Sequence, residues 1–132
     1  MIPRHVSDEI YRFKDPTDPA CVWLLNPRTS AFLANAPETS EFVAAWSLGA
    51  GESSVISMVE ATPGSIAVLD DLAARRCAAA LRLKMVGTLG LLLMAKKAGI
   101  IPSIRGPLDA IVSAGLFIAP HHLAEVQRQA GE

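Results

Sequence analysis

Apolar residues recur along much of the chain every three or four positions, the spacing that places side chains on one face of a helix. Val6, Ile10 and Phe13 follow this spacing after Pro3, a residue that suits a first helical turn. A proline- and aspartate-rich linker, Lys14–Pro19, then ends this segment. Together with alanine-rich composition and flanking turn residues, the pattern predicts helices over residues 3–13, 37–46, 52–61, 72–83, 89–98, 103–114 and 120–130.

Short continuous apolar runs lie between these helical segments. They predict strands at Cys21–Leu25, Ile66–Leu69 and Lys84–Val86. Ile66–Leu69 has no polar residue, which is typical of a strand that is covered on both faces. Because helices and strands alternate along the chain, we expect an α/β fold with a parallel sheet.

Length and composition indicate how many domains the protein has and whether it is globular. The 132 residues, of which 51% are hydrophobic and 19% charged, predict a single globular domain over residues 1–132. The net charge of -1 neither indicates nor excludes nucleic-acid binding, because a local basic patch can lie within a neutral total. Cys21 and Cys77 are expected to be reduced and buried. The start lacks a secretory signal and the apolar run 85–95 is too short to span a bilayer, so a cytoplasmic location is expected.

Glu9 is an acidic residue at a position where the apolar face of a helix would disfavour a charge. It lies three residues after Val6 and four before Phe13, on or beside the apolar face of the first predicted helix. An ionised carboxylate there must be paired, hydrogen-bonded or bound to a metal ion. Alternatively, Glu9 lies at the edge of that face and reaches water or an arginine.

Three further acids lie at the starts of predicted helices. Glu52 follows Gly51 and aligns with the apolar stripe of its helix, although a first-turn acid is also favoured by the helix dipole alone. Asp70 and Asp71 follow the strand Ile66–Leu69, at the sheet edge where parallel sheets bind ligands. Helix capping explains one of these two aspartates, whereas a nearby cation would relieve the repulsion between both.

Candidate phosphate contacts lie close to these acids in the sequence. Thr88 follows the strand Lys84–Val86, where it either caps a helix or lies at a helix terminus facing phosphate. Arg75 and Arg76 follow the two aspartates, and they either form a solvated helix face or steer a phosphodiester.

Oxygen ligands converging at one sheet edge suit hard divalent ions such as Mg²⁺ or Mn²⁺, which activate water for phosphodiester hydrolysis. Other chemistries lack support, because the chain has no nucleophile triad pattern, no Walker loop and no dinucleotide fingerprint. The adjacent histidines His121 and His122 point to different faces of a helix and are unsuited to chelating one ion.

Several of these segments resemble a PIN-like family. Ile2-Pro3-Arg4-His5-Val6-x-x-Glu9 is similar to the family's Ile-Pro-x-x-Val-x-x-Glu segment, and Gly51-Glu52 to the start of its Gly-Glu-x-Glu helix. Leu69-Asp70-Asp71 resembles its strand-end Asp-Asp run. The most specific likeness is Val86-Gly87-Thr88-Leu89-Gly90-Leu91-Leu92, and the resemblance is loose from Lys14 to Gly49.

The resemblance implies a three-layer α/β/α fold and a Mg²⁺- or Mn²⁺-dependent endoribonuclease. By this resemblance Glu9, Glu52 and Asp71 would be metal ligands and, with Asp70, the catalytic set. On the positional argument above, Thr88, Arg75 and Arg76 are the candidate nucleic-acid contacts. Relatives often serve as toxins of toxin–antitoxin pairs, so RNA, an antitoxin protein and a second copy of the chain are the expected partners.

The chain also departs from the family pattern. The family opens with a strand that carries an aspartate, and the sequence starts after the matching point; Ser54 replaces the second glutamate of Gly-Glu-x-Glu, and Leu72 replaces an arginine. Hard-cation affinity depends on ligand charge, so we expect reduced or absent nuclease activity. The alternatives are an inert module that binds nucleic acid or protein, and a start site placed too far downstream.

Overall fold

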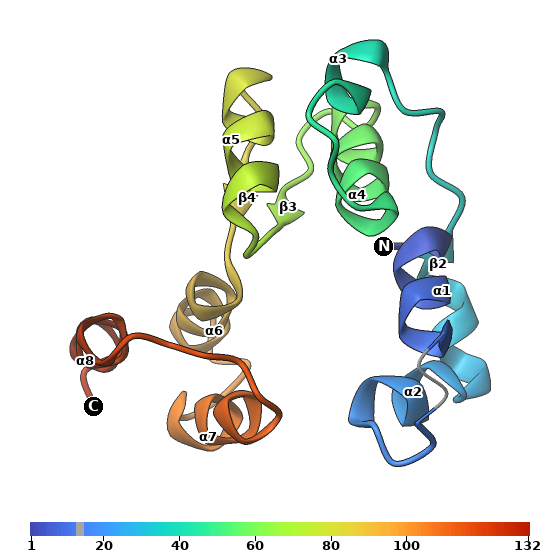
Figure 1. Ribbon diagram of the computed structural model, residues 1–132. Helices are drawn as coiled ribbons and strands as arrows, with labels where there is room; N and C mark the ends of the chain where they lie inside the picture. Colours follow the sequence, from blue (N-terminus) through green and yellow to red (C-terminus); the bar gives the residue numbers. More distant parts are fainter. Residues whose placement is uncertain (13–14) are drawn as a thin grey trace. The chain divides into compact units, whose positions relative to one another are not determined.

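The structure, a computed structural model, describes residues 1–12 and 15–132. The chain folds into two compact units, Met1–Met85 and Val86–Glu132 (Figure 1). Within the described residues, no helix is long and apolar enough to cross a membrane.

The first unit mixes helices with very short strands. Its elements are β1 (Ile2–Pro3), α1 (Arg4–Arg12), α2 (Pro19–Leu24), the 3-10 helix η1 (Pro27–Phe32), β2 (Leu33–Ala34), α3 (Glu41–Ala44), α4 (Ala50–Glu60), β3 (Ala67–Val68) and α5 (Leu72–Ala80). The unit boundary falls inside β4 (Met85–Val86), and the second unit contains α6 (Thr88–Lys97), α7 (Arg105–Ser113) and α8 (Pro120–Ala130).

Within residues 1–12 and 15–132, the strands form two separate two-stranded sheets. β1 runs parallel to β2, with Ile2 opposite Leu33 and Pro3 opposite Ala34. β3 pairs with β4, and next to that pair the Ala67 amide donates to the Lys84 carbonyl over 2.9 Å. Helices combined with short parallel strands confirm the predicted α/β class.

The predicted strand Cys21–Leu25 is wrong, because this segment belongs to helix α2. The Asp18 carboxylate accepts from the Ala20 amide at 2.7 Å and from the Cys21 amide at 3.4 Å, and Pro19 occupies the first turn. An N-cap aspartate followed by proline is a strong helix start signal. The apolar run then buries Cys21 and Leu24, which lie three residues apart on one helical face.

The boundaries of other predicted elements lie closer to the observed ones. The helix predicted from Pro37 begins only at Glu41, because the Ser40 hydroxyl caps it by accepting from the Val43 amide. The predicted helix end at Phe13 and the linker start at Lys14 lie outside the described residues. β2 was not predicted, since a strand of this length carries too few residues to show a period.

The strand at Ile66–Leu69 is present as β3, but it is not covered on both faces as predicted. Ala67 and Leu69 are 1% and 5% exposed, whereas Ile66 and Val68 are 46% and 45% exposed. This alternation is that of a strand with one face on the core. The other face is apolar and open.

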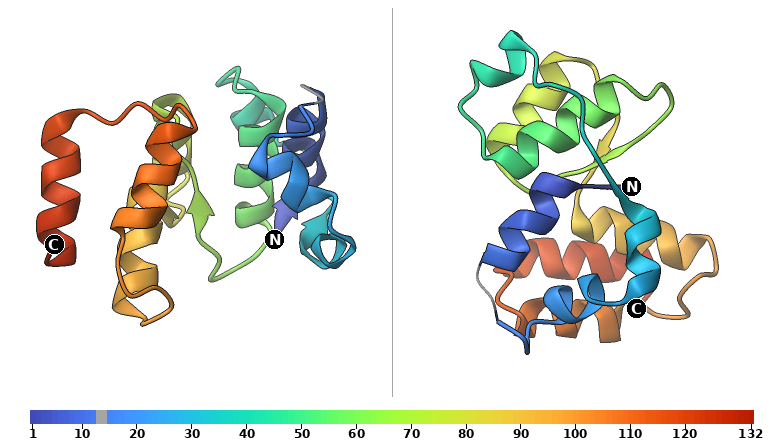
Figure 2. Two further views of the ribbon diagram at one scale, coloured as in Figure 1. Left: turned by 90° about the horizontal axis from the view of Figure 1, so that it is seen from below. Right: turned by 90° about the vertical axis from the view of Figure 1, so that its right-hand side faces the viewer.

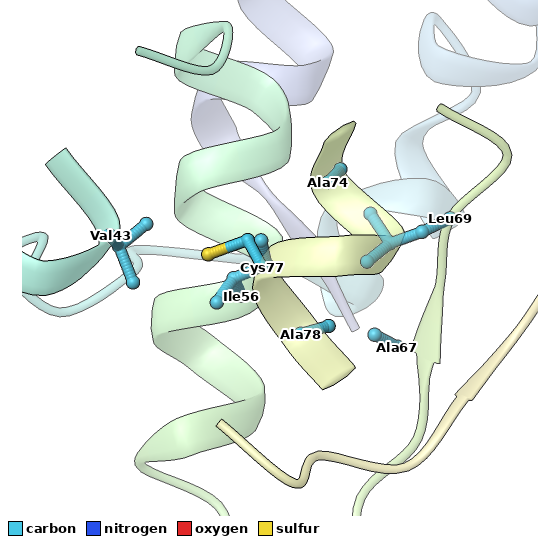
Figure 3. Close-up of a cluster of buried hydrophobic side chains, with 7 residues drawn as sticks. All are labelled: Val43, Ile56, Ala67, Leu69, Ala74, Cys77 and Ala78. Carbon is cyan, nitrogen blue, oxygen red and sulfur yellow. The ribbon is translucent and has the colours of Figure 1, made fainter. Parts of the chain in front are cut away.

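The core of the first unit lies between α4, α5 and the inner face of β3. Figure 3 shows its buried side chains, which come from α3, α4, β3, α5 and the residue after β3: Val43, Ile56, Ala67, Leu69, Ala74, Cys77 and Ala78. Burial raises the pKa of the Cys77 thiol, so it stays protonated and packs as a small apolar group. Both cysteines are buried and unbridged, as predicted.

The second unit has its own core of Ile104, Leu108 and Val126, and one carboxylate joins its helices. Glu132 pairs with Lys96 at the end of α6 and accepts from the Ser103 hydroxyl at 2.7 Å. The Ile104 amide, just before α7, donates to the same carboxylate over 3.0 Å. These contacts, led by the Lys96 hydrogen bond, lower the pKa of Glu132 to about 2.

This pKa predicts an acid sensitivity of the second unit. A lowered folded-state pKa contributes stability above the unfolded value, near 4.5, that is lost as pH falls toward 2. Glu132→Gln should therefore lower the melting temperature at pH 7 and have little effect near pH 2. Thermal unfolding measured between pH 2 and pH 7 tests this expectation. The matched control is Glu38→Gln, which changes an exposed acid of the first unit. An equal effect of Glu132→Gln at both pH values would contradict it.

Candidate functional site

The acids predicted as site residues line one cleft in the first unit. Glu9 comes from α1, Glu52 from the first turn of α4, and Asp70 and Asp71 from the link between β3 and α5. The cleft has a volume of about 260 Å³. Its remaining walls are apolar side chains and glycine backbone: Val6, Gly51, Val55, Val68 and Leu69. Segments more than 40 positions apart in the chain thus bring carboxylates together.

The Glu9 side chain extends from α1 to the start of α4. Its Oε1 accepts a hydrogen bond from the Gly51 amide over 2.8 Å, and its side chain is half-buried. The amides at a helix N-terminus carry partial positive charge and favour a carboxylate. Of the interpretations from sequence, the hydrogen-bonded carboxylate is therefore the one that is observed, with a helix terminus as the donor.

Gly51 allows this close approach because it has no side chain. A Cβ atom at position 51 would lie 2.5 Å from Glu9 Oε2, a separation that real Cβ atoms do not show. This role of Gly51 was missed by the sequence analysis. The signal was present in the pair Gly51-Glu52, which was used only for its glutamate.

Glu52 lies over the same helix start. A Cβ atom at Gly49, the N-cap of α4, would collide with Glu52 Oε2, so the carboxylate folds back toward the cap. The favourable helix dipole at this position was the simpler explanation for Glu52, and its placement agrees with that explanation. Both α1 and α4 thus direct an acid to one helix terminus.

Asp71 is the N-cap of α5. Its Oδ1 accepts from the Ala74 amide over 2.8 Å, so the capping role that was expected for one of the two aspartates belongs to Asp71. Asp70 precedes it, is exposed, and lines the cleft without being the cap residue. The aspartate pair therefore divides into one structural carboxylate and one at the mouth of the cleft.

The three predicted phosphate contacts do not lie together on one element. An Arg75 guanidinium nitrogen donates to the Leu69 carbonyl over 3.0 Å, so Arg75 lies at the strand end beside Asp70. Arg76 is exposed on α5. Thr88 is the first residue of α6, whose N-cap is Gly87, so the predicted capping role of Thr88 is wrong. Thr88 belongs to the second unit and the acids to the first.

The donor chemistry of the cleft suits a hard cation, because all its charged groups are carboxylates. In the part of the chain that the structure describes, however, no three His, Cys, Asp or Glu side chains are grouped closely enough to share an ion. Glu9 and Asp71 each bind a backbone amide through one of their two carboxylate oxygens. An ion would use the other oxygens and draw the acids closer.

The hydrogen bond between Glu9 and Gly51 generates a stability prediction. Glu9→Ala should lower the free energy of unfolding by about 1 kcal/mol, because the amide loses a charged acceptor at a partly exposed site. Glu9→Gln should cost less, since its amide oxygen still accepts a hydrogen bond. Urea unfolding measures both, with Asp8→Ala, at an exposed neighbouring acid on α1, as control. Equal effects of Asp8→Ala and Glu9→Ala would contradict the prediction.

Comparison with known proteins gives the family. A family model described as a PIN domain matches residues 1–132, across both units. No curated protein and no solved structure matches the chain. PIN domains generally use divalent metal ions, and the description points to nuclease-type chemistry. On the strength of a match over its full length, the chain belongs to the PIN-domain family.

Proposed function

We propose that this PIN domain is a metal-dependent endoribonuclease with an incomplete acidic site and weak activity. The observation that carries the proposal is the single cleft lined by Glu9, Glu52, Asp70 and Asp71. Carboxylates that line one cleft repel one another, and a hard divalent cation favours their ionised forms. Family membership supplies the nuclease chemistry.

In this proposal Glu9, Glu52 and Asp71 are the residues that would hold Mg²⁺ or Mn²⁺. When bound, the ion activates water and stabilises the leaving oxygen. Asp70, at the mouth of the cleft, orients the attacking water by accepting a hydrogen bond from it. Arg76 and Thr88 bind phosphate groups of the RNA, and Arg75 keeps the strand end in place through the Leu69 carbonyl.

Weak activity is part of the proposal. Ser54 lies one turn after Gly51 on α4, and its hydroxyl donates to the Gly51 carbonyl over 2.7 Å. A buried serine thus occupies the position where the resembling pattern has a second glutamate. With fewer charges, the cation is held less tightly.

The second candidate is a catalytically inert module that binds nucleic acid or a protein. The observation that favours it is the use of Glu9 and Asp71 as hydrogen-bond acceptors for helix amides, which gives both acids a structural role without any ion. The toxin role, the antitoxin, the homo-oligomer and the cytoplasmic location stay predictions of the sequence under either candidate.

Cleavage of single-stranded RNA with added Mn²⁺ tests the proposal. Asp71→Ser removes the carboxylate but keeps a good N-cap, so it should abolish cleavage and leave α5 folded. Glu52→Gln should also abolish it. Asp109→Asn, at an exposed acid of α7, is the matched control and should cleave like the unmodified protein. Cleavage that survives both site variants would remove the assignment, and its absence from the unmodified protein would favour the inert module.

RNA affinity tests the phosphate contacts separately from chemistry. Arg76→Gln should weaken binding and reduce the slope of log affinity against log salt by about 0.7, the loss of one phosphate contact on a single strand. Arg28→Gln, at an exposed arginine of η1, is the control. Filter binding in EDTA at several salt concentrations measures the RNA affinity and its salt dependence for both variants. An unchanged slope in Arg76→Gln would exclude this arginine from the interface.

A further inference from the structure

The Glu132 carboxylate lies among four donors of the second unit, Lys96, Ser103, Ile104 and Arg105, which we call the anion site. Its Oε1 accepts from the Lys96 ammonium and, over 3.0 Å, from the Ile104 amide. Its Oε2 accepts from the Ser103 hydroxyl at 2.7 Å and lies 3.5 Å from Arg105 Nε. The Glu132 side chain is 10% exposed, so donors from α6 and from the start of α7 enclose a nearly buried anion. Figure 2 shows α6, α7 and α8, coloured gold to red, in two orientations.

The anion site carries more positive charge than one carboxylate neutralises. Lys96 and Arg105 are two cations facing Glu132, and no other acid among the described residues pairs with either of them. A carboxylate brings one negative charge and two oxygens, whereas a phosphate monoester near neutral pH brings almost two charges and three terminal oxygens. Hydrogen bonds between such anions and ammonium or guanidinium groups are the strong ones. The donor set therefore matches a phosphate group better than the carboxylate that it holds.

A cavity of about 450 Å³ lies beside the anion site. Side chains of α6 and α8 line it: Leu93, Lys96, Lys97, Gln129 and Ala130. Lys96 belongs to both the cavity and the anion site, and its ammonium also donates to the Ala130 carbonyl over 2.7 Å. Lys97 forms no ion pair with the described residues, while Leu93 offers apolar contact area. The cavity has the volume of a small-molecule site, so an organic group attached to the phosphate fits there.

Glu132 can leave the anion site without unfolding α8. The helix ends at Ala130, and Gly131 follows it with a φ of 72° in the left-handed region. The Glu132 amide caps the helix by donating to the Gln127 carbonyl over 3.0 Å, a bond that does not involve the side chain. Rotation of the Glu132 side chain alone therefore exposes the four donors. Arg105 is 66% exposed, which leaves the anion site open to solvent on that side.

We propose that the second unit binds a small-molecule phosphate monoester, whose phosphate replaces the Glu132 carboxylate at the anion site and whose organic group lies in the cavity beside it. Glu132 holds the donors together until the ligand displaces it. Lys96 keeps its hydrogen bond to the Ala130 carbonyl in both states. The inference goes beyond the proposed nuclease activity and does not require it, because every residue involved belongs to the second unit.

The probe is phenyl phosphate at about pH 8, where it is a dianion, and calorimetric titration of the whole protein measures its affinity. Binding should be saturable. Glu132→Gln should tighten it about tenfold or more, because the competing carboxylate loses its charge. The matched control is Glu125→Gln, which changes another ion-paired acid of α8 and should bind within about twofold of the unmodified protein.

Two further probes separate charge from shape. Phenyl sulfate has the same shape with a single negative charge, and it should bind at least about tenfold more weakly than phenyl phosphate. Inorganic phosphate lacks the organic group and should also bind more weakly, because it makes no contact in the cavity.

A donor variant and a spectroscopic readout locate the ligand even if Glu132→Gln is unfolded by circular dichroism. Arg105→Gln changes an exposed side chain and should weaken phenyl phosphate binding, whereas Arg28→Gln, at an exposed arginine of the first unit, should not. In ¹⁵N spectra of the unmodified protein, the Ile104 amide signal should shift during the titration, because its acceptor changes from carboxylate to phosphate.

Four results would overturn the proposal: no binding of phenyl phosphate to the folded protein, equal affinity for phenyl sulfate, equal affinity for inorganic phosphate, or an Ile104 amide signal that does not move. Loss of RNA cleavage is measured with variants of the first unit, so the failure of one proposal is distinguishable from the failure of the other.

Discussion

The structure of the candidate site depends on one hydrogen bond, from the amide of Gly51 to the carboxylate of Glu9. It joins α1 to the N-terminus of α4, and it determines where the first acid lies. Glycine at position 51 leaves room for this bond, because a Cβ atom there would lie 2.5 Å from Glu9 Oε2 and the carboxylate would have to shift. The positive end of α4 also attracts Glu52, so one helix terminus positions two of the acids. The capped start of α5 brings Asp70 and Asp71 to the same cleft.

This arrangement gives the acids two roles that compete. Glu9 and Asp71 stabilise helix starts, which is useful to the fold without any ligand. The same carboxylates are the hard oxygen ligands that a divalent ion requires. The fold brings the four acids to one cleft, although no three of them, among the described residues, are grouped closely enough to share an ion without a shift of their side chains. Under the proposed function, the balance between these roles would set how tightly the cleft holds a cation.

The sequence predicted the features that depend on local signals. Long helical stripes located α4 through α8, and the acids at segment ends were recognised because carboxylates beside apolar runs require a physical explanation. The segment Cys21–Leu25 was assigned to a strand because the run is short and apolar, while the capping Asp18 and Pro19 decided the outcome. The open face of β3 was not predictable either. Whether Ile66 and Val68 are covered depends on which elements pack on that face of β3, and no local pattern records that packing.

The most direct test of the account is the location of a bound paramagnetic ion. With Mn²⁺ added to ¹⁵N-labelled protein, line broadening in NMR spectra reports which amides lie near the ion. The amides of Gly51, Asp70 and Asp71 should broaden first, and Glu52→Gln should diminish this broadening. Broadening centred on other acids, such as Asp15 and Asp18, or unchanged by Glu52→Gln, would contradict it.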